Sequence, residues 1–288
     1  MTAPAAPNDP LWAETDARAH VRAPRSDDDK YRRGVVGLRT GADEYPGAAV
    51  LGVEAAWRSG AGMVRYIGPR RAEDLVLARR PETVTAGGRV QAWVLGSGTD
   101  AATRAPAETS ALRDLLDGEV PIVVDAGALD LAPDASAPRI LTPHAREHDR
   151  LRAALGLADA GADRAASVAE TARAVDAVVL LKGARTLVAA PDGTLLAVEA
   201  GTPWLATAGT GDVLAGIIGA LVAAAAADHP RLDPRRLAGL AATGAWVHGR
   251  AARRASARHA GGPITALDVA EAVPAVLGEE LAAGSQPR

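Results

Sequence analysis

The sequence predicts an α/β fold in which helices cover both faces of a largely parallel sheet. From residue 30 onward, short apolar runs alternate with longer stretches of helical pattern, which is typical of βαβ units. Runs such as residues 122–124 (IVV) are apolar throughout, as strands buried on both faces are. Residues 186–199 break the alternation, because two strand-like runs there flank the turn Pro191-Asp192-Gly193. We therefore expect one antiparallel hairpin within the sheet.

The expected elements follow one another in a regular order. Strands are predicted at 34–38, 62–67, 92–95, 120–124, 139–142 and 177–181. Helices between them are predicted near 47–59, 72–79, 101–117, 145–156 and 163–175, and after the hairpin at 212–227, 234–257 and 266–277. Residues 1–28 read as a tail or linker with a short helix near 11–20, residues 29–280 as one domain, and residues 281–288 as a C-terminal tail.

Composition indicates an ordinary globular protein. Hydrophobic residues make up 48% of the 288 residues and the net charge is −3, so nothing points to a nucleic-acid partner. We see neither a signal peptide nor an uninterrupted apolar run of about 18 residues, which predicts no membrane contact and a cytoplasmic location. Cysteine is absent, which excludes disulfides and thiolate chemistry. Lys30 and Lys182 are the only lysines among the 32 lysine and arginine residues. In a chain that otherwise uses arginine, a lysine suggests a position that needs the compact ammonium group. The alternative is that these two lysines occur by chance.

Candidate site residues follow the ends of four predicted strands. They are Gly98 after 92–95, Asp125 after 120–124, His144 and Glu147 after 139–142, and Lys182 with Gly183 after 177–181. Ligands of open parallel sheets bind beyond the carboxyl ends of the strands, so we expect these loops to meet at one edge. Asp125 suits a cap or turn as well, and we leave it out of the predicted site.

The segment Gly209-Thr210-Gly211-Asp212 leads directly into an apolar helical stretch. The first N–H groups of a helix have no internal partners, and glycines let an anion approach them closely. Asp212, at or near the N-cap, either caps the helix or takes a proton from a substrate hydroxyl. A carboxylate beside an anion hole at Gly209, Thr210 and Gly211 fits phosphoryl transfer to an alcohol.

Several motifs together resemble one family. Residues 206–214 (ATAGTGDVL) are similar to the signature of the ribokinase-like superfamily. The motif order across residues 29–250 resembles its ADP-dependent NAD(P)H-hydrate dehydratase branch, in the actinobacterial form. The further motifs are YPGA (45–48), VLGSG (94–98), IVVDAGAL (122–129), ILTPHAREHDRL (140–151) and VVLLKGARTLVAAPDG (178–193). YPGA together with Thr142-Pro143-His144 is the most selective part. The resemblance implies a ribokinase-like three-layer α/β/α sandwich.

The resemblance also implies an activity and its residues. NADH or NADPH hydrated at C6 of the nicotinamide ring would be phosphorylated by ADP, with release of AMP and then of phosphate. Mg²⁺ and a homotetramer are implied as well. The implied roles are general base for Asp212, contact with the hydrated dinucleotide for Ala48, Gly98, His144 and Asp212, nucleotide binding for Lys182, Gly183, Ala184, Arg185, Thr186 and Gly211, and metal placement, largely through water, for Glu147.

Alternatives stay open at this point. Ala48 suits helix packing, Gly98 suits a turn, His144 and Glu147 suit a helix start, and His148 is expected at the surface. The chain departs from the usual glycines of the family at 38–41 and at Asp100. Residues 1–28 are too few for the N-terminal epimerase half that many members carry, so we expect the dehydratase half alone. The rival functions are a ribokinase-like kinase of a thiazole or pyrimidine alcohol, and a nucleotide-binding sensor without catalysis.

Overall fold

A mixed sheet of eight strands lies at the centre of the computed structural model, as far as the described residues 10–284 go. The strands stand in the order β2-β1-β3-β4-β5-β6-β7-β8; β1 to β6 are parallel, and β7 and β8 are antiparallel to their neighbours. They are β1 (Val35–Arg39), β2 (Met63–Tyr66), β3 (Ala92–Leu95), β4 (Ile122–Val124), β5 (Arg139–Leu141), β6 (Val178–Leu181), β7 (Thr186–Ala189) and β8 (Leu195–Val198). The predicted parallel sheet with one antiparallel hairpin is confirmed.

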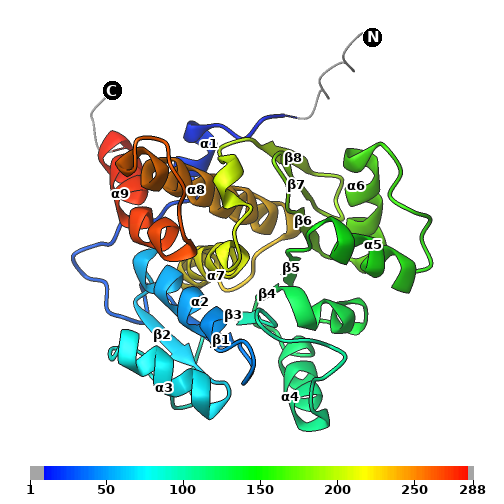
Figure 1. Cartoon of the computed structure of the whole chain (residues 1–288), viewed down its shortest axis with the longest axis horizontal. Coiled ribbons are helices and arrows are strands. Elements are labelled where there is room, and N and C mark those ends of the chain that lie inside the picture. The colour runs from blue at the N-terminus through cyan, green and yellow to red at the C-terminus, as the bar shows by residue number, and fades with distance from the viewer. Residues whose placement is uncertain (1–9, 285–288) are drawn as a thin grey trace.

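Helices cover both faces of this sheet, as Figure 1 shows. The helices are α1 (Glu14–Arg18), α2 (Gly47–Arg58), α3 (Arg70–Arg79), α4 (Pro106–Leu116), α5 (Ala145–Ala154), α6 (Arg164–Val175), α7 (Thr210–Asp228), α8 (Pro234–Arg258) and α9 (Ala266–Gly284). One apolar core packs α2, α7, α8 and α9 against one face. A second core packs α4, α5, α6 and the 3₁₀ segment η1 (Ala126–Asp134) against the other. The layers are therefore helix, sheet and helix.

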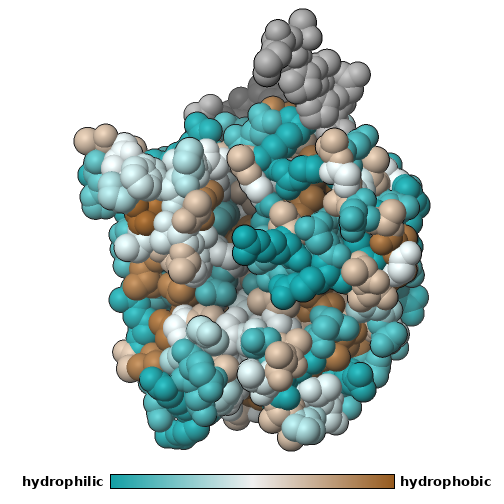
Figure 2. Space-filling model, turned by 45° about the vertical axis from the view of Figure 1, so that its right-hand side comes forward, coloured by the Kyte–Doolittle hydropathy of each residue, from teal (hydrophilic) through white to brown (hydrophobic). Residues whose placement is uncertain are grey.

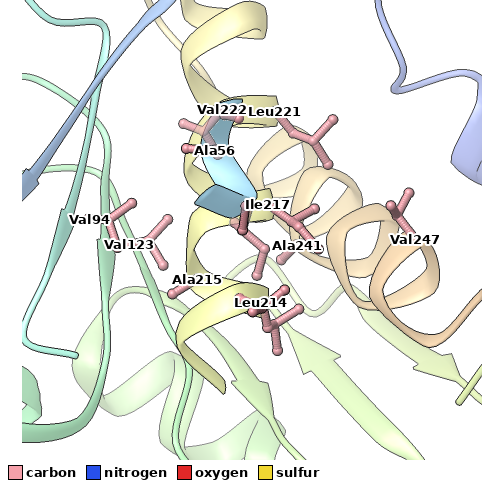
Figure 3. Close-up of a cluster of buried hydrophobic side chains, with 14 of the residues drawn as sticks. Ala56, Val94, Val123, Leu214, Ala215, Ile217, Leu221, Val222, Ala241 and Val247 are labelled. Atoms are coloured by element: carbon pink, nitrogen blue, oxygen red, sulfur yellow. The ribbon is translucent and has the colours of Figure 1, made fainter. Parts of the chain in front are cut away.

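Helix α7 is the centre of the larger core. Figure 3 shows Ile217, Leu221 and Val222 of α7 among side chains from the sheet, from α2 and from α8. A Cβ at Gly216 would stand 2.3 Å from the carbonyl oxygen of Gly52, so α2 and α7 touch through their backbones. By length and composition α7 is apolar enough to cross a membrane, but most of it is buried inside the protein. Its hydrophobicity is explained by the core.

Several elements differ from the expected ones, among them α9, which continues to Gly284 and so into the predicted C-terminal tail. Helix α4 begins at Pro106, later than predicted, because Pro106 occupies the first helical turn and Asp100 accepts a hydrogen bond from the N–H of Ala102 in the preceding turn. Two 3₁₀ segments, η1 and η2 (Pro203–Leu205), were not expected. Helix α7 begins at Thr210 rather than at residue 212.

Part of the segment predicted as a tail packs on the domain. The N–H of Trp12 donates to the carbonyl of Ala197 in β8 at 2.7 Å, and Ala17 of α1 is fully buried. Arg22 pairs with Asp28 and with Asp228 at the end of α7. Residues 1–9 and 285–288, which belong to the predicted tails, lie outside the described residues. On the face drawn in Figure 2, hydrophilic side chains dominate and hydrophobic ones are scattered among them.

Candidate active site

The loops that follow β1 and β3 meet at the carboxyl edge of the sheet. The N–H of Gly41 donates to the carbonyl of Ser97 at 2.7 Å. Gly98 has a φ of +68°, and a Cβ there would stand 2.4 Å from the Cβ of Ala48 and 2.9 Å from the carbonyl oxygen of Tyr45. Gly98 and Ala48 are thus in direct contact, between two strands where the strand order reverses. Such a reversal is where open α/β sheets bind ligands.

The N-terminus of α7 lies beside α2. A Cβ at Gly52 would stand 3.7 Å from the carbonyl oxygen of Asp212, and a Cβ at Gly209 would stand 2.5 Å from the side chain of Leu51. The backbone contact between the two helices therefore brings the first turn of α7 close to the first turn of α2, which holds Ala48. The N–H groups of Ala48 and Thr210 donate to the carbonyls of Tyr45 and Thr207, each at 3.4 Å, and both turns carry the positive end of a helix dipole, which favours a bound anion.

Lys182 lies among carboxylates from three other segments. Its Nζ donates to Asp125 Oδ1 at 2.9 Å and lies 3.7 Å from Glu147 Oε2. A Cβ at Gly211 would stand 3.6 Å from the same Nζ, so the ammonium group faces the first turn of α7. Burial lowers the pKa of Lys182, but the charges of Asp125 and Glu147 outweigh it and raise that pKa above its ordinary value. Lys182 is therefore a fixed cation next to the proposed anion hole.

Asp125 is the site residue that the sequence prediction left out. It is 2% exposed, and its carboxylate accepts hydrogen bonds from Ser97 Oγ at 2.9 Å and from Thr142 Oγ1 at 2.8 Å, besides the one from Lys182. It thus joins the ends of β3, β5 and β6. Its position directly after a strand predicts that it lies at the edge of the sheet. Only its ion pair with Lys182, which the sequence does not reveal, distinguishes it from an ordinary turn residue.

Asp212 is the third residue of α7 and does not cap it. The N-cap is Gly209, in a left-handed conformation with a φ of 87°, so Asp212 lies near the N-cap, three residues beyond it, and the capping alternative does not apply. Among the described residues, no hydrogen bond or ion pair involves the carboxylate of Asp212, which is partly buried. Burial and the charge of Asp125 raise its pKa to about 7, while Lys182 opposes that shift.

This arrangement has a definite chemical capacity. A carboxyl group with a pKa near neutrality accepts a proton readily when an alcohol is deprotonated. The neighbouring ammonium and the N–H groups of the helix stabilise a negatively charged group held next to that alcohol. A proton acceptor and groups that can stabilise a phosphoryl group therefore lie together at the same edge of the sheet.

His144 and Glu147 begin α5 as a reciprocal capping pair. The N–H of His144 donates to Glu147 Oε2 at 2.8 Å, and the N–H of Glu147 donates to His144 Nδ1 at 3.3 Å. The N–H of Lys182 donates to the carbonyl of Pro143 at 2.9 Å, which fixes this helix start beside the lysine. The two residues therefore cap the helix, as the alternative interpretation expected. The same cap leaves the imidazole of His144 half exposed and near Lys182.

His148 is buried, and its predicted place at the surface is wrong. It is 1% exposed, and its Nε2 lies 2.9 Å from Thr171 Oγ1 of α6. Burial, with the nearby charge of Arg152, lowers its pKa to about 4. The reason for the miss is periodicity: His148 shares the inner face of α5 with Leu151 and Arg152, whose guanidinium is satisfied by backbone carbonyls. His148 is a packing residue of the second core.

The predicted nucleotide-binding segment is the turn between β6 and β7. Gly183 and Ala184 are exposed, and Thr186 Oγ1 donates to the carbonyl of Gly183 at 3.1 Å. The guanidinium of Arg185 pairs with Glu199 at 2.5 Å. The turn follows Lys182 directly, so the structure brings it to the same edge of the sheet as Gly211 and Asp212.

No group of three or more side chains suited to a metal occurs among residues 10–284. The oxygen donors near Lys182 are the carboxylates of Asp125 and Glu147, and both accept hydrogen bonds. Mg²⁺ commonly relies on one or two carboxylates, several waters and phosphate oxygens. The donor set fits a metal that is held chiefly by a bound nucleotide.

Comparison with known proteins agrees with this geometry. A family profile described as NAD(P)H-hydrate dehydratase matches residues 36–275. The bifunctional NAD(P)H-hydrate repair enzyme Nnr of Mycobacterium tuberculosis is 46% identical over 223 residues, which are 73% of this chain and 45% of that protein. The chain thus spans about half the length of the curated relatives it matches.

Two solved structures resemble the fold. The ADP/ATP-dependent NAD(P)H-hydrate dehydratase of Bacillus subtilis, co-crystallised with ATP and Mg²⁺, superposes with a TM-score of 0.80 at 28% identity and covers 96% of this chain and 100% of that chain. A ribokinase-like superfamily protein of Enterococcus faecalis has a TM-score of 0.78 at 21% identity, with 94% and 96% of the two chains covered. The ribokinase-like sandwich predicted from the motifs is confirmed.

Proposed function

Because the chain belongs to the NAD(P)H-hydrate dehydratase family, we propose that it restores hydrated NADH or NADPH by dehydration at the expense of ADP. The observation that carries this proposal is the carboxylate of Asp212. It has no partner among the described residues and a pKa raised to about 7, and it stands at the turn that faces Lys182. A base of this kind is needed because the hydroxyl on the ring is a poor leaving group and must be phosphorylated first.

The proposed reaction has two steps. Asp212 takes the proton of the C6 hydroxyl, and the hydroxyl oxygen attacks the terminal phosphorus of ADP. The bond between this phosphorus and the oxygen that bridges the two phosphates breaks, and AMP leaves. The ring nitrogen then expels phosphate from C6, and a proton leaves the neighbouring carbon to restore the double bond. The N–H groups of the turn at 209–212 and the ammonium of Lys182 stabilise the phosphoryl group during transfer.

Ala48, Gly98 and His144 are proposed to contact the hydrated dinucleotide, and the segment 182–186 with Gly211 to contact ADP. The close contact between Gly98 and Ala48 supports this, because it leaves little side chain at the ends of β1 and β3 and lets a ligand approach the backbone there. Mg²⁺ is proposed to be held by nucleotide phosphates, with Glu147 acting through water because its Oε2 already accepts the N–H of His144. When bound, the ion would neutralise phosphate charge.

The test is a repair assay with the purified protein. Hydrated NADH is mixed with ADP, with ATP or with no nucleotide, and the return of the NADH absorbance band is followed. We expect recovery only with nucleotide and fastest with ADP, with AMP formed in equal amount. A thiazole alcohol in place of the hydrate is the control, and consumption of that alcohol without any hydrate repair would favour the kinase function instead.

Assembly and location also belong to the proposal. We infer a cytoplasmic homotetramer from the family resemblance. Analytical ultracentrifugation is expected to give about four times the chain mass of 29.3 kDa, and a species at the mass of a single chain would contradict the tetramer.

A further inference from the structure

A cavity at the C-terminal end of α7 lies outside the proposed active site. It encloses about 420 Å³, which is within the range of about 300–1,000 Å³ that small-molecule sites occupy. Leu221, Ala224 and Asp228 of α7 line it, whereas Asp212 lies in the first turn of the same helix. A helix rises about 1.5 Å per residue, so Asp228 is about 24 Å from Asp212 along the helix axis. A ligand in this cavity would therefore not touch the reacting groups.

Segments that are far apart in the sequence form the wall of this cavity. They are the segment 19–24, the end of α2 at residues 58–60, the start of α8 at Arg236, and residues 274–281 of α9. Backbone contact holds α7 in place here, because a Cβ at Gly34 would stand 2.6 Å from the backbone of Ala223. Gly34 directly precedes β1, so the cavity lies at the amino edge of the sheet, opposite to the edge that carries Lys182.

The apolar part of the wall is aliphatic. Val21 of the N-terminal segment, Leu221 of α7 and Leu277 of α9 line the cavity together. These side chains have no hydrogen-bonding atoms, so they favour an alkyl group over a polar one. Removal of that alkyl group from water then contributes to binding.

The charged side chains of the wall are mainly cationic. The permanently charged residues that line the cavity are Arg22, Arg33, Arg58, Arg236 and Asp228. Arg22 is neutralised, because it pairs with Asp28 and with Asp228, each at 2.7 Å. Arg58 is neutralised as well, by Glu54 at 2.6 Å. The charge that remains is that of the other two arginines.

Arg33 and Arg236 form no ion pair with any residue in the described part of the chain. Nη2 of Arg33 donates to the carbonyl of Gly60 at 3.0 Å, which leaves the positive charge uncompensated. The backbone N–H of Arg236 donates to Asp233 at 2.7 Å, and this bond does not involve the guanidinium. Guanidinium groups hold carboxylates and phosphates through paired N–H donors, so that of Arg236 is suited to an anion.

We propose that this cavity binds a small organic anion with an aliphatic part, whose head group pairs with Arg236 while its alkyl part packs on Leu221 and Leu277. Arg33 adds positive charge near the end of α2. Neither feature alone selects a ligand, because an arginine at a surface is normally solvated and an alkyl surface accepts any apolar group. Their combination in one cavity of this size selects an amphiphilic anion. The proposal does not depend on the proposed function.

The test is calorimetric titration of the purified protein with hexanoate and with hexyl phosphate, which share the alkyl part and differ in the head group. We expect at least one of them to bind with a dissociation constant of about 0.1–1 mM, and the tighter one identifies the head group. Hexanol lacks the charge and acetate lacks the alkyl part, so each is expected to bind at least about 10-fold more weakly. No saturable binding of either hexyl anion would overturn the proposal.

Two substitutions test the named residues. Arg236→Gln is expected to weaken binding of the tighter anion roughly 10-fold, because a charge-assisted contact is lost. Gly278→Leu places a side chain in the cavity wall, where a Cβ meets no atom within 4 Å. It is expected to abolish binding without loss of folding, since glycine is unfavourable inside a helix.

Arg235→Gln is the matched control for Arg236→Gln. Arg235 is the neighbouring residue on α8, 81% of its side chain is exposed, and it does not line the cavity. Its substitution is expected to leave the affinity for the hexyl anions unchanged. Equal affinities in the two glutamine variants would contradict the role of Arg236 and with it the proposal.

Lys182→Ala shows at which end of α7 the anion binds. Its affinity for the hexyl anions is expected to equal that of the wild type, because Lys182 lies at the opposite edge of the sheet. A loss as large as that in Arg236→Gln would place the anion at the proposed active site and refute the cavity as its site. These titrations need no hydrate repair, so a protein that repairs no hydrate would contradict the proposed function alone.

Discussion

Two carboxylates on neighbouring helices have opposite environments. Glu54 of α2 is fully buried, and it accepts hydrogen bonds from Arg58, Arg79 and Arg80. Burial raises its pKa, but those three guanidinium groups outweigh burial and lower the pKa to about 2. Asp212 of α7 has no such partner among residues 10–284, and its pKa rises to about 7.

The difference teaches how to separate a structural acid from a reactive one. Both groups lie on helices of the same core, so burial alone does not distinguish them. The two acids differ in the cations that pair with them. Three arginines form ion pairs with Glu54. Lys182, the cation that acts on Asp212, forms its ion pair with Asp125 instead. An acid whose pKa lies near 7 because few cations pair with it is suited to accept a proton, and an acid that is fully paired with cations is not.

The largest expected effect comes from Asp212→Asn, which removes the proposed base. We expect kcat for hydrated NADH to fall by about 10²- to 10⁴-fold, the usual scale for general base catalysis. ADP affinity, measured by calorimetry, is expected to change by no more than a few-fold, because the asparagine keeps the shape of the side chain. A rate like that of the wild type would remove Asp212 from the mechanism.

The same variant has a consequence for stability. Since the folded state raises the pKa of Asp212, the ionised carboxylate destabilises the fold as pH rises. Asp212→Asn is therefore expected to melt at a higher temperature than the wild type at pH 8, with a smaller difference at pH 5. Calorimetric melts at the two pH values measure this, and a lower melting temperature at pH 8 would contradict it.

Lys182→Ala is expected to raise the KM for ADP by roughly 10- to 100-fold, with a smaller change for the hydrate, because a charge-assisted contact to phosphate is lost. Initial rates at varied ADP and at varied hydrate separate the two. Lys30→Ala, the matched control, removes the other lysine, which is exposed and far from the site in sequence. An ADP response that is the same in both variants would leave Lys182 without a role.

Glu54→Gln sharpens the comparison from the structural side. Removal of a buried charge leaves three arginines partly unpaired, and since those arginines are partly exposed we expect a loss of about 1–3 kcal/mol in the free energy of unfolding. The folded fraction is expected to keep kcat within about twofold, because Glu54 takes no part in proton transfer. Urea denaturation measures the loss. A fall in kcat as large as that for Asp212→Asn would erase the contrast between the two acids.

The smallest effect is a shift in pH dependence. With Asp212 as base, kcat should fall as pH drops through about 7. Asp125 is a cause of the raised pKa, so Asp125→Asn should move this acid limb to lower pH. The two hydroxyls bond to different oxygens of Asp125, so the amide oxygen keeps one of these hydrogen bonds and the amide NH₂ can donate to the other hydroxyl, Ser97 Oγ or Thr142 Oγ1. A profile that does not move, in a variant that binds ADP normally, would show that Asp125 does not influence the base.

The sequence predicted the sheet well because its strands are short runs of uniformly apolar residues, and the hairpin was marked by Pro191 and Gly193. Gly98, His144, Glu147 and Lys182 were placed at one edge by their positions after strands, whereas Ala48 and Gly211 were assigned by the family resemblance. Asp125 was left out of the predicted site because its meaning depends on a partner distant along the chain, Lys182. His148 was misplaced although its spacing from Leu151 and Arg152 puts it on the inner face of α5.

The backbone contact of Gly52 with Gly216 has one more consequence. The cores on both sides of the sheet consist largely of alanine, valine and leucine, and hydrophobic cores tolerate several substitutions together when the total volume is kept. The gap between the first turns of α2 and α7 is set by peptide atoms instead, which no codon change alters while both glycines remain. The chain can therefore replace much of its interior over evolutionary time and still present the two helix ends at the same spacing.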